Sequence, residues 1–316
     1  MQASKQQVTE YLSWLTNVRR VLPSTVYLYG DTIEKFGQFV NGTPWHMVTA
    51  ENAESFMARP RRGGVAPAPS SMQRDRVVLS GFFNYLASKG AVSPNPMVDV
   101  GIPKVRRRQP KALTDTELLA LWDAARIPED KVWLGLGGFV GLRRTEMSGL
   151  EVDKVDTDSG WIKAIVRKGR SVMDIEYRDL AGLIGDSCPA LGEAAAEWVG
   201  VVEPYVRRRR ELGARFVLPW DTPASAKVVQ RIGLADAEHP DPIILNKRLK
   251  GICDRTAVKA TVHSLRHTCA TNLFRSGLDV MTIADQLGHT SIDTTRIYLN
   301  TSGQVANWRA SRARQD

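Results

Sequence analysis

The stretch of residues 263–298 constrains the fold most, because short apolar patterns at helical spacing are interrupted there by glycines. Ile283 and Leu287 are four residues apart and so share one helix face. Gly277 and Gly288 are suited to helix C-termini, where glycine tolerates the left-handed backbone. We therefore expect three short packed helices here and no sheet.

Chemically capable side chains lie on the same stretch. His263 and Arg266 are three residues apart and share a helix face, and His267 lies one turn beyond His263. His289 follows the glycine that ends the second helix, and Tyr298 lies on the third. Each residue alone is equally explained by packing in the core or by exposure on the surface, so only their combination indicates a functional site.

The composition limits the class of protein. The chain has 316 residues, enough for two domains, and its 43% hydrophobic and 24% charged content is ordinary for a globular protein. No apolar run reaches membrane-spanning length, and no signal-peptide pattern follows Met1. Its three cysteines are far apart and lack CxxC spacing, which argues against disulfides or a zinc site and indicates the cytoplasm.

The net charge of +9 is spread over both halves of the chain. Residues 1–104 contain 11 Lys or Arg against 7 Asp or Glu, and residues 105–316 contain 32 against 27. Two basic halves favour a polyanion held between two lobes over a single basic tail.

Residues 1–100 show helical apolar patterns and no β-alternation of any length. Ser24 and Thr49 are candidate caps of two of these helices. The segment is expected to be a small helical bundle that lies on DNA or, as the alternative, a bundle whose basic residues are merely solvated. Its candidate DNA contacts lie in a Gly- and Pro-rich loop and on the following helix: Arg61, Arg62, Arg74 and Arg76.

Residues 101–113 are expected to form a basic linker, because prolines disfavour regular structure there. An extended basic linker could lie along the phosphates of DNA. Equally, its charges could serve only to keep the linker in solvent. The candidate DNA contacts in it are Arg106, Arg107 and Arg108.

The second domain is expected to span residues 114–316. Thr114 and Glu117 form a capping-box pattern at its first helix. Residues 161–166 and 172–177 are the only clear strands, and they predict a hairpin. The run Arg207–Arg210 fits a helix C-terminus slightly better than a DNA contact. Four prolines predict a long irregular insert over residues 213–243.

Five elements in a fixed order carry a resemblance to a known family. They are Gly141-Leu142-Arg143-x-x-Glu146, Lys168 on the hairpin, His263-x-Leu265-Arg266-His267, Leu287-Gly288-His289, and Tyr298. Arg266 precedes His289 by 23 residues, and His289 precedes Tyr298 by nine. In order and spacing this set resembles the tyrosine recombinase (phage integrase) family over nearly the whole chain.

The resemblance implies a mainly α-helical fold with a small β-sheet. A helical, SAM-like core-binding domain and a mixed α/β catalytic domain would form a C-shaped clamp on double-stranded DNA. Because the helical pattern begins almost at Met1, we expect a compact integrase without an additional arm-binding domain. The implied targets are core-type attachment sites.

The resemblance also implies the roles of the site residues. Tyr298 would be the nucleophile that forms a 3′-phosphotyrosyl link, and Lys168 would protonate the 5′ leaving oxygen. The transition-state phosphate would be held by Arg143, Arg266, His263 and His289, with His263 also able to accept the tyrosine proton. Glu146 and His267 would support these residues, and no metal, cofactor or ATP would be required.

Several alternatives stay open at this point. Lys163 on the preceding strand could replace Lys168 as the general acid, and Arg144 competes with Arg143, which is preferred because it directly follows Gly-Leu. The favoured function is integration and excision of a phage or mobile element in a bacterial cytoplasm. Chromosome-dimer resolution, a type IB topoisomerase-like activity and a non-catalytic DNA-binding regulator are the alternatives.

Assembly is implied by the resemblance as well. We expect a monomer alone and a homotetramer on paired DNA sites, with a directionality factor as a possible further partner. The residues after Tyr298 would form a tail that docks on a neighbouring protomer in trans, with docking in cis left open.

Overall fold

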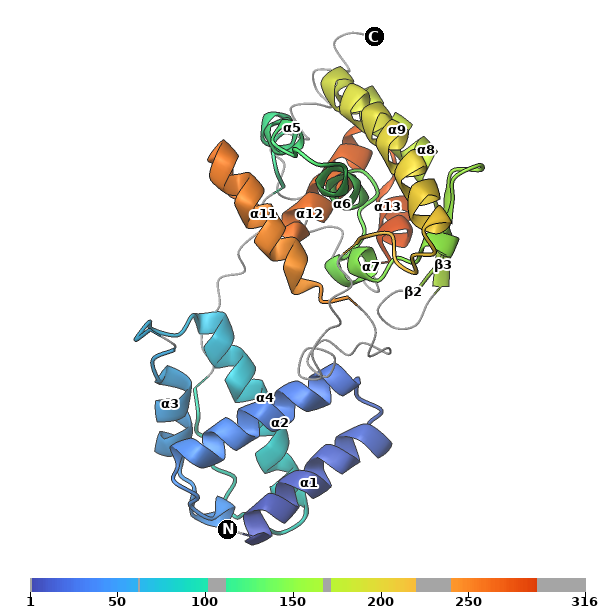
Figure 1. Cartoon of the computed structure of the whole chain (residues 1–316). Coiled ribbons are helices and arrows are strands. Elements are labelled where there is room, and N and C mark those ends of the chain that lie inside the picture. Colours follow the sequence, from blue (N-terminus) through green and yellow to red (C-terminus); the bar gives the residue numbers. More distant parts are fainter. Residues whose placement is uncertain (1, 62, 102–111, 167–171, 220–239, 289–316) are drawn as a thin grey trace. The chain divides into compact units, whose positions relative to one another are not determined.

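The computed structural model describes residues 2–61, 63–101, 112–166, 172–219 and 240–288 (Figure 1). These residues fall into two compact units, one with the described residues up to Gly101 and one with those from Ala112 onward. The mainly helical fold with one small sheet is confirmed. Because residues 102–111 lie outside the described part, the linker boundaries stay predictions. No described helix is both long and apolar enough to cross a membrane.

The described residues of the N-terminal unit form helices and one 3₁₀ turn. These elements are α1 (Gln2–Asn17), α2 (Pro23–Phe39), η1 (Trp45–Met47), α3 (Ala50–Ala58) and α4 (Pro69–Ser88).

Helix α4 is the centre of the N-terminal unit and contacts α1, α2 and α3. Its Phe82 and Phe83 are fully buried and pack edge-on against Trp45 from η1. Phe36 of α2 joins the same cluster. Full burial of each such aromatic ring contributes about 2–3 kcal/mol to folding, so this cluster holds the unit together.

One of the two predicted caps is confirmed and the other is wrong. Thr49 caps α3 in a reciprocal capping box with Asn52. Helix α2 instead begins at Pro23, so Ser24 lies inside the first turn and makes no cap. Proline is preorganised for the first helical position because its ring fixes φ, and the helix therefore starts two residues before the start that a Ser24 cap predicts.

The described residues of the C-terminal unit combine helices with a three-stranded sheet. The first elements are α5 (Asp115–Asp123), α6 (Pro128–Gly138), α7 (Arg144–Ser148), η2 (Val152–Lys154), β1 (Val155–Asp156), β2 (Trp161–Val166) and β3 (Val172–Glu176). The later ones are α8 (Tyr177–Ser187), α9 (Pro189–Glu211), α11 (Ile243–Thr256), α12 (Val262–Arg275) and α13 (Val280–Leu287).

Helix α12 runs through the core of this unit and contacts α6, α8, α11 and α13 (Figure 1). Nearly all of its residues are buried, including Leu265 and Leu273 at 0% exposure. On the other side of α6, Trp198 of α9 lies against Gly135, where a Cβ atom would be only 2.1 Å from the indole ring. This close approach fixes α9 on α6, and α6 in turn supports α12.

The sheet is antiparallel in the order β1-β2-β3. Ile162 opposite Ile175 packs its inner face into the core, and Val166 pairs with Val172 at the hairpin end. The register shifts at Ala164, which has a left-handed backbone (φ 52°) and whose N–H donates to Asp174 at 2.7 Å. This bulge bends β2, and residues 167–171, which follow it in the sequence, lie outside the described part.

Candidate active site

Arg266 is the most deeply placed of the predicted site residues. The helix that carries it, α12, starts in a capping box between Thr261 and Ser264. Arg266 is 1% exposed and donates from Nη1 to the carbonyl oxygen of Gly141 at 2.5 Å and from Nη2 to that of Leu287. A buried cation is tolerated only when its N–H groups are bonded, so these carbonyls fix the guanidinium in place.

Arg143 is held beside Arg266 by one carboxylate. As the N-cap residue of α7, it donates from its backbone N–H and from Nη1 to the two oxygens of Glu146, at 2.7 and 2.8 Å. The same carboxylate lies 4.0 Å from Nη1 of Arg266. Nη2 of Arg143 donates to the carbonyl of Gly288 at 2.7 Å. Glu146 therefore offsets part of the repulsion between the two arginines.

Two glycines make this arrangement possible. Gly141 has φ +77°, and a Cβ atom there would lie 2.5 Å from Leu287 and 3.1 Å from Cys269. Gly288 ends α13 in the left-handed conformation (φ 60°) and turns its carbonyl toward Arg143. Glycine is the residue that adopts such backbone at little cost, so the predicted stop at Gly288 is confirmed and also serves the site.

His263 lies at the mouth of the site. Its ring meets that of buried His267 edge-on, with centroids 4.3 Å apart. Desolvation of its inner side and the positive charges of Arg266 and Arg143 lower its pKa below 6.5. The imidazole is therefore neutral at pH 7 in the free protein, the form that can accept a proton.

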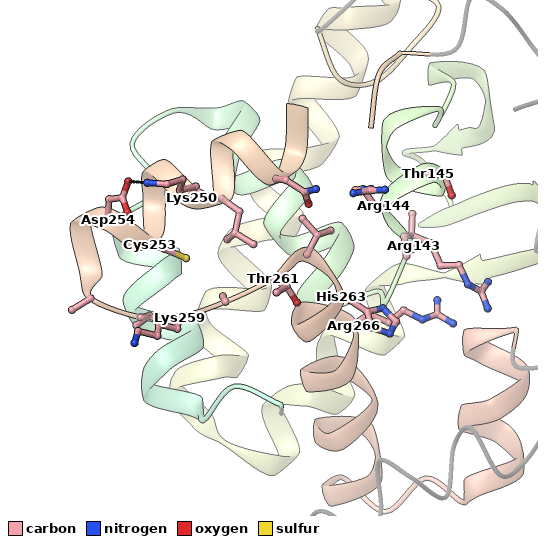
Figure 2. Close-up of a pocket in the computed structure, with 17 residues that line it drawn as sticks. Arg143, Arg144, Thr145, Lys250, Cys253, Asp254, Lys259, Thr261, His263 and Arg266 are labelled. Atoms are coloured by element: carbon pink, nitrogen blue, oxygen red, sulfur yellow. Dashed lines mark hydrogen bonds and ion pairs between the residues drawn. The ribbon is translucent and has the colours of Figure 1, made fainter. Parts of the chain in front are cut away.

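A cavity of about 1080 Å³ opens next to these residues (Figure 2). Arg143, His263 and Arg266 line one wall, and helix α11 with the turn before α12 forms the other. The structure thus brings three of the six predicted catalytic residues to one cavity, together with Glu146 and His267 behind them.

The other predicted residues of this site lie outside the described residues. These are Lys168, His289 and Tyr298. The helix predicted around Tyr298 and the tail predicted after it also lie outside the described residues. Most of the predicted insert over 213–243 is also outside the described part.

Lys163, the alternative to Lys168, is bound elsewhere. Its ammonium donates to Asp156 at 2.8 Å on the exposed side of the hairpin. The hydrogen bond and charge of Asp156 raise the pKa of Lys163. A general acid should release its proton readily, so this pairing disfavours Lys163 for that role.

The predicted DNA contacts of the N-terminal unit have intramolecular partners. Asp75 is 1% exposed and accepts hydrogen bonds from Arg59, Arg61 and Arg74 at 3.0, 2.9 and 3.5 Å. Arg76 donates twice to the carbonyl of Val100. These arginines tie the loop after α3 and the end of the unit to α4. Arg62, Arg106, Arg107 and Arg108 lie outside the described residues.

The run of arginines at the end of α9 also has local partners. Arg207 donates to Thr157, Arg209 to the carbonyl of Phe216, and Arg210 to two carbonyls near β1. Arg208 pairs with Glu211 on the surface. The run therefore fastens the C-terminal end of α9 to the sheet region.

Arg144, the alternative to Arg143 in the sequence motif, also lines the cavity. It lines the cavity together with Asn246 and Lys259. The one available signal was the doubled arginine itself, since nothing in the pattern showed that the two side chains point to different places.

The chain is similar to known recombinases in sequence and in fold. Residues 234–304 match the model of the phage integrase family. The tyrosine recombinase XerC of Roseiflexus castenholzii is 28% identical, over 96% of this chain and 91% of that protein.

Two solved structures share the fold. A lambda integrase (75–356) dimer bound to a COC′ core site has a TM-score of 0.66 at 16% identity, over 95% of this chain and 96% of that chain. A lambda integrase tetramer bound to a Holliday junction has a TM-score of 0.65 at 15% identity, over 93% of this chain and 76% of that chain.

Proposed function

Because this chain belongs to the tyrosine recombinase family, an enzyme family that cleaves and rejoins DNA, we propose that it joins specific DNA sites through a covalent link to Tyr298. The observation that carries the proposal is the pair Arg143 and Arg266, held at one cavity wall around Glu146. Two permanently charged, planar guanidinium groups suit the non-bridging oxygens of a phosphorane-like transition state.

In the proposed reaction, the hydroxyl oxygen of Tyr298 attacks phosphorus, and the bond from phosphorus to the 5′ oxygen breaks. His263 accepts the tyrosine proton, because free tyrosine has a pKa of about 10 and needs a base at neutral pH. Lys168 donates a proton to the leaving oxygen, and His289 bonds the phosphate.

The cleaved strand then ends in a 3′-phosphotyrosyl link. A 5′-hydroxyl from another strand attacks this link, which restores a phosphodiester and releases the tyrosine. The link conserves the energy of the broken bond, so no ATP is consumed, and the residues named above carry the reaction without a metal ion.

We propose that the two units clamp double-stranded DNA. The basic charge of both halves supports this, since counterion release from phosphates drives non-specific DNA binding. Arg61, Arg74 and Arg76 each donate to partners within the unit, so they would reach phosphates only through their remaining N–H groups. Arg62 and the linker arginines 106–108 complete the proposed contacts.

For the biological role, we propose integration and excision of a phage or mobile element at core-type sites. The similarity to XerC recombinases favours a second candidate, chromosome-dimer resolution. Both roles use the same chemistry. The lambda integrase tetramer on a Holliday junction supports a tetramer on DNA as the working form, and a directionality factor would be a partner of the integrase role only.

Nicked duplexes of randomised sequence test the proposed chemistry. Cleavage close to the nick releases a short fragment, so the covalent intermediate cannot religate and accumulates as an SDS-stable adduct. We expect an adduct with the wild type and none with Tyr298→Phe, which lacks only the hydroxyl. An undiminished adduct with Tyr298→Phe would refute the nucleophile assignment.

Sequencing of the trapped DNA gives the target and separates the two roles. Two identical copies of the trapped site are placed as direct repeats on a plasmid. Efficient deletion between identical copies favours chromosome-dimer resolution. An integrase is expected to act instead only when one copy is replaced by a different trapped site.

A further inference from the structure

The charges that line the cavity are unequal. Five Lys or Arg side chains face one carboxylate, that of Asp254. Lys250 pairs with Asp254 at 2.7 Å, and Arg143 pairs with Glu146. A cavity wall with this surplus of positive charge attracts anions.

Two of the five cations have no partner among the described residues. Arg266 donates to the carbonyl oxygens of Gly141 and Leu287. The two cations without a partner are Arg144 and Lys259. Arg144 is half-buried at the start of α7, and Lys259 is exposed on the turn before α12. Both can therefore accept an external anion without breaking an ion pair within the described part of the chain.

The two adjacent arginines point in opposite directions. In Figure 2 the side chain of Arg143 extends toward α13, whereas that of Arg144 extends across the cavity toward α11. This follows from the local structure, because Arg143 is the N-cap residue of α7 and is bonded to Gly288, while Arg144 is the first helical residue. The two guanidinium groups therefore face different parts of the cavity.

We propose that Arg144, assisted by Lys259, binds a second backbone phosphate of the DNA, separate from the phosphate that reacts. The proposal rests on the function proposed above. Phosphates follow one another at about 3.4 Å along each strand's axis. A strand that presents one phosphate to Arg143 and Arg266 therefore brings neighbouring phosphates to the same cavity.

The test is equilibrium binding of a fluorescent duplex of unrelated sequence, about 30 base pairs long, measured as a function of salt. Arg144→Gln should weaken binding roughly tenfold at low salt. It should also reduce the slope of log K against log salt by about 0.9, the value for one phosphate contact. Arg144→Lys, which keeps the charge, should retain the wild-type slope.

Arg208→Gln is the matched control, because Arg208 is an exposed arginine on α9 away from the cavity. An unchanged slope in Arg144→Gln, or an equal change in Arg208→Gln, overturns the proposal. So does a loss confined to the trapped target with unrelated DNA unaffected, which would make Arg144 a reader of base edges. The wild-type adduct on nicked DNA is scored separately, so failure of the proposed function is distinguishable from failure of this phosphate site.

Discussion

At the residue scale, Glu146 connects the two arginines of the site. It is 6% exposed in its side chain, bonds Arg143 twice and lies near Arg266. Glu146→Gln keeps the shape but removes the charge and turns an N–H toward a donor. We expect single-turnover cleavage of the trapped substrate to fall about 10- to 100-fold, the worth of hydrogen bonds to charged groups.

Glu151→Gln is the control for this substitution. Glu151 also pairs with an arginine, Arg215, at 3.0 Å, and it lies outside the cavity. Cleavage at the wild-type rate is expected for it. Equal losses in both variants would show that Glu146 acts on stability and not on the site.

The pKa of His263 gives a second prediction at this scale. Burial of the inner side of the ring and two nearby guanidinium groups lower that pKa below 6.5. Because the folded-state pKa is lowered, the group contributes stability above pH 6.5 that is lost as pH falls through the folded-state value. NMR titration of the free protein, assigned with His263→Gln, should give a midpoint below 6.5, and a midpoint above 6.5 contradicts the account.

At the element scale, the end of α13 packs closely against the turn after α6 at Gly141. Gly141→Ala puts a Cβ atom 2.5 Å from Leu287 and forces a left-handed backbone on alanine. We expect the free energy of unfolding to fall by about 2–3 kcal/mol, from overpacking and backbone strain. Urea unfolding followed by circular dichroism measures this.

Gly200→Ala is the matched control on α9. Gly200 lies inside the helix, and an added Cβ atom there meets nothing within 4 Å. Alanine is the better helix former, so unfolding should cost about 0.5–1 kcal/mol more than in the wild type. A loss at Gly200 similar to that at Gly141 would remove the support for a local clash.

The β2–β3 hairpin decides which lysine is the general acid. Lys163 is tied to Asp156, so Lys163→Met should cleave at close to the wild-type rate, and Lys168→Met should be strongly impaired. A 5′-thiolate leaving group needs no proton, because a thiol has a much lower pKa than an alcohol. Such a substrate should rescue Lys168→Met, and rescue of a defective Lys163→Met would reverse the assignment.

The sequence predicted elements well where a pattern is local. The capping box predicted at Thr114 and the cap predicted at Thr49 mark true helix starts, and the strand predicted at 161–166 is confirmed. The strand predicted at 172–177 ends one residue earlier, because Tyr177 begins α8. Helix α8 was missed because Gly182 and Gly185 weaken its helical pattern. Gly185 packs closely against Gly192 of α9. The absence of a side chain at Gly185 therefore allows α8 and α9 to approach each other, which the sequence alone does not show.

Charged residues were harder to predict than elements. Three arginines bond to buried Asp75. The sequence does not predict these contacts, because Arg59, for example, is 16 residues from Asp75. Likewise, Arg143 meets Gly288 across 145 residues. Motif order indicated that such residues belong together, but the partners of each guanidinium depend on packing between distant segments.

At the scale of the whole molecule, we expect the protein to assemble on DNA. Light scattering should give the mass of a monomer for the protein alone and that of a tetramer with paired target sites. Cooperative assembly is expected because strand exchange joins two sites, each cleaved on both strands. Monomeric complexes at every protein concentration would rule out the proposed working form.

In the proposed reaction, Tyr298 becomes covalently joined to a 3′ phosphate of DNA. The most direct measurement is mass spectrometry of the trapped adduct after digestion with protease and nuclease. We expect a peptide containing Tyr298 that carries a nucleotide through its 3′ phosphate. A link to any other residue, or to a 5′ phosphate, would contradict it.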